Sequence, residues 1–100
     1  MKKAMIDKKL QSFDIADFLQ NRKFLAEYLR QVLEQGDASE LAAALGHVAR
    51  FRGMAEIANE TGITREALYK ALRADSQPRL DTLQRVCKAL GVKLTIEPVI

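Results

Sequence analysis

Hydrophobic residues recur at helical spacing along most of this chain. Residues 24–33, 41–51 and 83–90 each place an apolar side chain at every third or fourth position, which is typical of helices with one buried face. Residues that begin or end helices flank these stretches, namely Asn21, Gly36, Asp37, Gly53 and Gly91. The pattern predicts about five helices and an all-α fold. Before the five helices, we expect residues 13–19 to form a short turn or helix and residues 1–12 to form a flexible basic N-terminal arm.

The most specific pattern is GMAEIANETGITREALYKAL, residues 53–72. Ile57 supplies the buried side of a first helix, and Leu68 and Leu72 supply that of a second. Gly62 stands between them, where a tight reversal requires a positive φ. We therefore expect two short helices joined by a turn, the arrangement that presents a second helix to the major groove of DNA.

The outer face of the second helix and the loop after it carry the candidate DNA contacts. Thr64 is placed to cap the helix, Arg65 and Lys70 are placed to contact base edges, and the later residues are placed to contact the phosphate backbone. The full set is Thr64, Arg65, Glu66, Tyr69, Lys70, Arg73, Ser76, Gln77 and Arg79. A solvated helix face with a Glu66 to Lys70 ion pair is the alternative interpretation.

Residues 92–97 alternate apolar and polar side chains up to Pro98, which predicts a short C-terminal β-strand. A single strand cannot satisfy its own backbone groups. It needs a second copy of the chain, the N-terminal arm or another protein as its partner. A dimer is favoured because one reading helix contacts few base pairs. Its candidate contacts are Val92, Leu94 and Ile96.

Composition and charge narrow the function. The 100 residues are enough for one small domain. The net charge is +3, and the positive charge is concentrated in residues 64–93, which contain seven basic and three acidic residues. No stretch has the length of apolar sequence that a membrane span requires, and no secretory signal is present, so we expect a cytoplasmic protein without membrane association. A lone Cys87 and a lone His47 exclude a zinc finger. No nucleophile and base pair or phosphate loop indicates an enzyme, and no metal or cofactor is expected.

The run ALGHVARFRGMAEIANETGITREALYKAL, together with Pro78, Leu83 and KALGVKL, resembles the addiction-module antidote proteins. These are HigA-like antitoxins with a helix-turn-helix of the phage-repressor (Xre) type. The resemblance implies a five-helix, lambda-repressor-like domain over residues 13–100. Residues 13–36 would be an N-terminal helical extension, residues 37–91 the Xre-type core and residues 92–97 the strand.

The same resemblance implies a function. Such proteins neutralise a toxin of the RelE/ParE superfamily and repress their own operon by binding double-stranded operator DNA, so we expect an antitoxin and repressor that acts as a homodimer. Glu56 departs from the pattern, because relatives often carry Gln there, whose amide can donate to a phosphate. Two alternatives remain: a prophage-type regulator without a toxin partner, and a protein-interaction module that has lost DNA binding.

Overall fold

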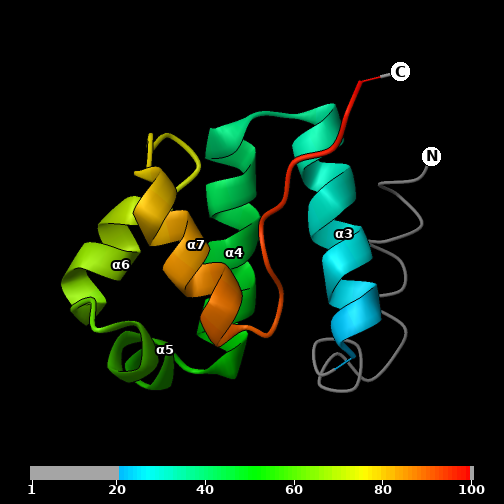
Figure 1. Ribbon diagram of the computed structural model, residues 1–100. Helices are drawn as coiled ribbons and strands as arrows, with labels where there is room; N and C mark the ends of the chain where they lie inside the picture. The colour runs from blue at the N-terminus through cyan, green and yellow to red at the C-terminus, as the bar shows by residue number, and fades with distance from the viewer. Residues whose placement is uncertain (1–20, 100) are drawn as a thin grey trace.

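The computed structural model describes residues 21–99, and within them the chain is all-helical. The elements in order are α3 (Arg22–Gln35), α4 (Ala38–Arg52), α5 (Met54–Thr61), α6 (Arg65–Ala71) and α7 (Leu80–Ala89) (Figure 1). The predicted all-α class and the five helices are confirmed. The expectations for the N-terminal arm (1–12) and for residues 13–19 lie outside the described residues.

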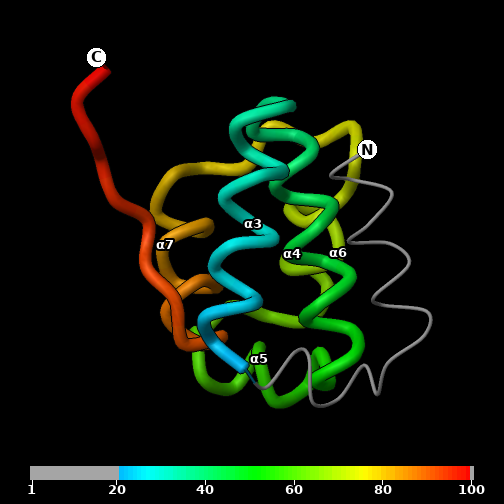
Figure 2. Tube along the Cα trace, turned by 90° about the vertical axis from the view of Figure 1, so that its right-hand side faces the viewer, coloured from blue at the N-terminus to red at the C-terminus, as the bar shows by residue number. Residues whose placement is uncertain are grey.

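α3 and α4 form an antiparallel pair, side by side in both views (Figures 1 and 2). Asn21 caps α3 by accepting hydrogen bonds from the amides of Lys23 and Phe24. Asp37 caps α4 by accepting from the amide of Glu40 at 3.0 Å. Each side chain satisfies backbone donors that the first helical turn leaves without a partner. The chain reversal at Gly36 is therefore fixed by the capping residue that the sequence indicated.

The core lies where the other helices pack on α4. Leu45, Ile57, Leu68 and Val86 come from four different helices and are all fully buried. Burying such a side chain stabilises the fold by roughly 1.5 to 3 kcal/mol. The core stripes predicted for α5, α6 and α7 are confirmed.

The predicted stripes of α3 and α4 were too wide. Phe51 was expected to continue the buried line of α4, but it is 54% exposed. At about 100° per residue, position 52 and not position 51 continues the line through Leu41, Leu45 and Val48. Arg52 is indeed half-buried there, and its Nη2 donates to the carbonyl of Leu90. Phe24 and Leu33, at the two edges of the α3 stripe, are also exposed.

Gly46 lets the end of α6 approach α4 very closely. A Cβ atom at this position would lie 2.5 Å from the carbonyl oxygen of Leu72, directly after α6. Ser39, at the start of the same helix, donates its hydroxyl to the carbonyl of Ala74. Both ends of the short segment from Leu72 to Ala74 are thus held against α4.

The C-terminal segment does not form the predicted β-strand. After α7 the amide of Val92 donates to the carbonyl of Cys87, and residues 92–97 then run without helical coiling along the body (Figures 1 and 2). The alternation is real, because Val92 and Leu94 pack against the core while Lys93 and Thr95 are exposed. A strand also requires a neighbouring strand as its hydrogen-bonded partner, and within residues 21–99 no backbone–backbone hydrogen bond reaches residues 93–97.

Candidate nucleic-acid interface

The turn between α5 and α6 is tightly fixed. Gly62 adopts the left-handed conformation, with φ 73° and ψ 16°, and its amide donates to the carbonyl of Ala58. Thr61 is buried, and its hydroxyl donates to the carbonyl of Ile57 at 2.8 Å and accepts from the amide of Ile63. The positive φ predicted for Gly62 is confirmed. The angle between the two helices is therefore set by hydrogen bonds as well as by packing.

Thr64 begins α6 as the sequence predicts. Its backbone is extended, and its Oγ1 accepts a hydrogen bond from the amide of Ala67 at 3.1 Å. In this cap the Thr64 hydroxyl acts only as an acceptor, through one lone pair of its oxygen. Its proton can therefore still be donated to a second group.

The buried and exposed faces of α6 also follow the predicted pattern. Leu68 and Leu72 lie beneath the helix with at most 1% of their surface exposed. The polar residues of the opposite face are exposed, namely Arg65, Glu66, Lys70 and Arg73. Tyr69 lies at the margin with 40% of its surface exposed. The charged side chains of α6 therefore lie in solvent, while the opposite face of the helix is packed into the core through Leu68 and Leu72.

Arg50 of α4 joins this face, and the sequence analysis did not identify it. Its guanidinium lies 5.7 Å from the centroid of the Tyr69 ring, within range of a cation–π contact. The contact joins two helices that are far apart in the sequence, so the helical pattern of residues 53–72 contained no signal for it. It places a cation over the ring of Tyr69, on the exposed side of α6.

The loop after α6 is fixed by its own side chains. The hydroxyl of Ser76 lies 2.6 Å from the carbonyl oxygen of Ala71 and 2.8 Å from that of Arg73, so it closes the loop and does not project from it. Arg73 also lies 3.6 Å from the carboxylate of Asp75. Both side chains of that pair are exposed, so water screens their attraction.

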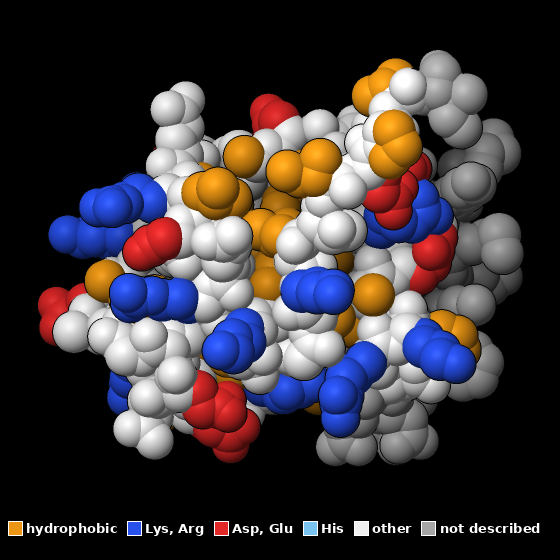
Figure 3. Space-filling model, viewed as in Figure 1, with side chains coloured by type: hydrophobic (Ala, Val, Ile, Leu, Met, Phe, Trp, Pro, Cys, Tyr) orange, Lys and Arg blue, Asp and Glu red, His pale blue; other side chains and the backbone are white. Residues whose placement is uncertain are grey.

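Gln77 and Arg79 are exposed at the end of this loop, and Arg79 is the N-cap residue directly before α7. Charged side chains lie over α6 and the following loop at the left of Figure 3, with Lys and Arg in the majority. The surface has the positive character that phosphate contact requires.

Residues 21–99 contain neither a cluster suited to a metal ion nor a helix suited to a membrane. No group of three or more His, Cys, Asp or Glu side chains lies close enough together to hold a metal ion. No helix in the same range is long and apolar enough to cross a membrane.

Comparison with known proteins assigns the family. A model of the family described as "probable addiction module antidote protein" matches residues 9–98. The chain belongs to this family. The chain is also 36% identical, over 88 residues, to an uncharacterized protein of Haemophilus influenzae, and the match covers 88% of this chain and 91% of that protein. No solved structure matches the chain.

Family membership confirms the resemblance to addiction-module antidotes that the sequence showed. An antidote acts against a toxin, so the family implies a toxin as a partner. The HigA-like subtype and the lambda-repressor type of the helix pair stay predictions.

Proposed function

We propose that this antidote protein is the antitoxin of a type II toxin-antitoxin module and a sequence-specific DNA-binding repressor of its own operon. Helices α5 and α6 form its helix-turn-helix, and α6 enters the major groove. The protein acts in the cytoplasm as a homodimer, and its two reading helices contact half-sites about one helical turn apart, roughly 34 Å. Repression follows because the bound dimer covers a promoter.

The observation that carries this proposal is the rigid presentation of α6. Its buried residues are fully packed, Thr64 caps its start, and Gly46 lets its end rest on α4. A reading helix must hold its side chains in fixed positions, because each base contact depends on hydrogen-bond geometry.

The exposed residues divide into two roles in this proposal. Arg65 and Lys70 contact base edges, for which Arg matches the two acceptors of guanine. Thr64, Glu66 and Tyr69 line the same groove. Arg73, Gln77 and Arg79 position the duplex through its phosphates, and Ser76 holds the loop that carries them. Arg50 extends this positive rim from α4, since its guanidinium lies over Tyr69.

The toxin partner in this proposal belongs to the RelE/ParE superfamily. It follows from the resemblance to HigA-like antitoxins together with the family match. Purification of the protein from its native host should therefore yield a small toxin with it. If the protein is isolated without one under conditions that preserve weak complexes, a prophage-type regulator fits better.

DNA binding is tested by fluorescence anisotropy with the DNA upstream of the gene and a scrambled duplex, at several salt concentrations. The native duplex should bind more tightly, and the affinity should fall as salt rises, because phosphate contacts release counterions. Arg65→Ala or Lys70→Ala should each weaken binding to the native duplex about 5- to 100-fold, as expected for a lost base contact.

Lys23→Ala is the matched control, because Lys23 is an exposed lysine on α3 and its loss changes the net charge by the same amount. It should leave affinity nearly unchanged. Equal weak binding to both duplexes, insensitive to Arg65→Ala and Lys70→Ala, would contradict the repressor and support a protein-interaction module.

A further inference from the structure

The C-terminal segment offers an unpaired edge beside exposed apolar side chains. Ile96 and Val99 are 96% and 98% exposed, although Leu94 packs against the core. Within the described part of the chain, no backbone hydrogen bond involves the amides or carbonyls of residues 93–97. An unpaired edge of this kind is a template for another strand.

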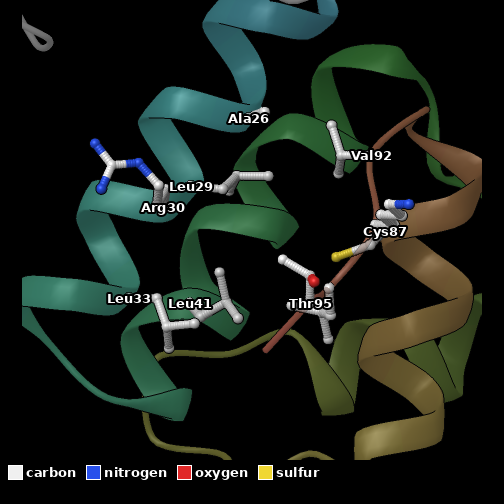
Figure 4. Close-up of a pocket in the computed structure, with 10 residues that line it drawn as sticks. Ala26, Leu29, Arg30, Leu33, Leu41, Cys87, Val92 and Thr95 are labelled. Carbon is white, nitrogen blue, oxygen red and sulfur yellow. The ribbon is translucent and has the colours of Figure 1, made fainter. Parts of the chain in front are cut away.

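An apolar groove lies beneath this segment. It has a volume of about 200 Å³ and is lined by side chains of α3, the start of α4, α7 and residues 92–95. Leu29, Leu33 and Leu41 point toward the segment, Cys87 faces the same space, and Arg30 turns its guanidinium away (Figure 4). Hydrophobic side chains are visible along the middle of this face in the space-filling view (Figure 3).

The sequence of residues 93–97, KLTIE, is complementary to itself in antiparallel pairing about Thr95. In that register Lys93 lies opposite the partner's Glu97, Leu94 lies opposite the partner's Ile96, and Thr95 lies opposite the partner's Thr95. Each facing pair is favourable, because it joins opposite charges, two apolar side chains or two threonines. Shifting the register moves Lys93 away from the carboxylate.

We propose that residues 93–97 pair with the same residues of a second copy as a two-fold antiparallel β-ribbon centred on Thr95. A two-fold axis makes the interface isologous, so the pair of Lys93 with the partner's Glu97 forms twice or not at all. Residues directly opposite in a ribbon point to the same face. Leu94 faces the core, so the partner's Ile96 lies beside it at the groove and loses its exposure to water.

Pro98 limits the ribbon at the far end because it has no amide to donate. The unpaired segment of the single chain thereby becomes a strand through dimerisation. This inference rests on the homodimer of the proposed function and specifies the residues that join its two copies. Its tests use no DNA, so a failure of the ribbon and a failure of DNA binding are separate results.

Cysteine cross-linking tests the register. In the full-length protein, Thr95→Cys places two thiols directly opposite each other on the axis, and mild oxidation followed by thiol blocking should give a disulfide-linked dimer. Lys93→Cys and Glu97→Cys should each fail to cross-link alone, because each faces a different residue, but an equimolar mixture of the two should form the mixed dimer. Wild-type protein controls for Cys87, which is buried.

Charge reversal tests the pairing itself, with the dimer dissociation constant measured by sedimentation equilibrium. Lys93→Glu should weaken the dimer about tenfold, because two attractive pairs become repulsive, and adding Glu97→Lys should restore most of the loss. Lys88→Glu is the control, since Lys88 is exposed on α7 outside the ribbon. The single Lys93 variant is the cleaner test, because Glu97 also interacts with Arg30 of its own chain: Glu27 most strongly, then Glu34 and Glu97, raise the pKa of Arg30.

Three results would overturn the proposal. The first is a wild-type protein that stays monomeric up to millimolar concentration. The second is a dimer in which Thr95→Cys does not cross-link while Lys93→Cys or Glu97→Cys does so alone. The third is a dimer whose dissociation constant is the same in the Lys93 variant as in the Lys88 control.

Discussion

Glu56 is the residue of α5 at which the proposed interface places a carboxylate against DNA. It is exposed in the first turn of α5. A carboxylate stabilises that end of a helix because the backbone dipole is positive there. The same carboxylate would repel a phosphate bound at the helix N-terminus. Helix stability and DNA affinity therefore place opposite demands on this position.

Replacing Glu56 with Gln should raise affinity for the native duplex by about threefold and lower the free energy of unfolding slightly, by about 0.3 to 1 kcal/mol. Anisotropy titration and chemical denaturation measure the two effects. Glu60→Gln, an exposed change in the last turn of the same helix, is the control. It should leave DNA affinity nearly unchanged, and it should not lower the free energy of unfolding, because a carboxylate opposes the helix dipole at this end. Lower affinity of the Glu56 variant would argue against a phosphate at this end of α5.

For single residues, the sequence correctly predicted the features that depend only on near neighbours in the chain. The caps at Asn21, Asp37 and Thr64 and the left-handed Gly62 were all predicted, because each depends on neighbours within a few residues. The contact of Arg50 with Tyr69 could not be predicted, because it depends on how α4 and α6 cross.

Among the elements, α4 is the support that sets the position of α6. It contributes seven buried residues, and two of its polar or small residues hold the segment after α6. Gly46 permits the close approach to Leu72, and Ser39 binds the carbonyl of Ala74. The loop that follows the proposed reading helix is thus fixed to a different helix.

Gly46→Ala should destabilise the fold by about 1 to 3 kcal/mol, because the added methyl group would overlap the Leu72 carbonyl and the backbone cannot yield cheaply. Thermal and urea unfolding measure the change. The sign is informative, because Gly to Ala in an open helix stabilises by roughly 0.5 to 1 kcal/mol. A stabilised variant would mean that α6 shifts readily. His47→Ala, exposed on the same helix, should have little effect.

The elements also show where a linear pattern misleads. Helix positions followed from periodicity, but a three-residue step assigned Phe51 to the core although the helical angle favours position 52. The alternation of residues 92–97 correctly indicated that Val92 and Leu94 face the body, but it placed Ile96 with them, and Ile96 is exposed. The alternation could not supply a hydrogen-bonded partner, and the single chain contains no strand within residues 21–99.

For the whole molecule, dimerisation and DNA binding should be linked. A single α6 contacts few base pairs, so tight binding needs two copies held at a fixed spacing. If residues 93–97 join the copies, the apparent affinity for DNA depends on protein concentration whenever that concentration is near the dimer dissociation constant.

The disulfide-linked Thr95→Cys dimer should therefore bind the native duplex with a simple hyperbolic curve, and more tightly than wild type at low nanomolar concentration. The same variant after reduction should show a steeper curve, because dimerisation precedes binding. Anisotropy with and without reductant compares the two states of one protein. Identical curves under both conditions would show that dimerisation through Thr95 is not linked to DNA binding.

For the whole molecule, sequence similarity identifies the family but not the partners. Membership among the antidotes follows from residues 9–98 as a whole. The nine candidate DNA contacts stay predictions, because helix patterns define an exposed face and not the molecule that meets it. The operator and the toxin depend on partners that the chain does not contain.

The lone thiol of Cys87 makes the C-terminal segment observable by chemistry. Burial raises its pKa to about 11, so at neutral pH it is a protonated thiol with almost no reactive thiolate. It also lines the groove that residues 92–95 cover. A thiol reagent can react with Cys87 only when residues 92–95 move away from the groove. The labelling rate therefore reports how often this segment opens. Any partner bound on the segment should lower that rate.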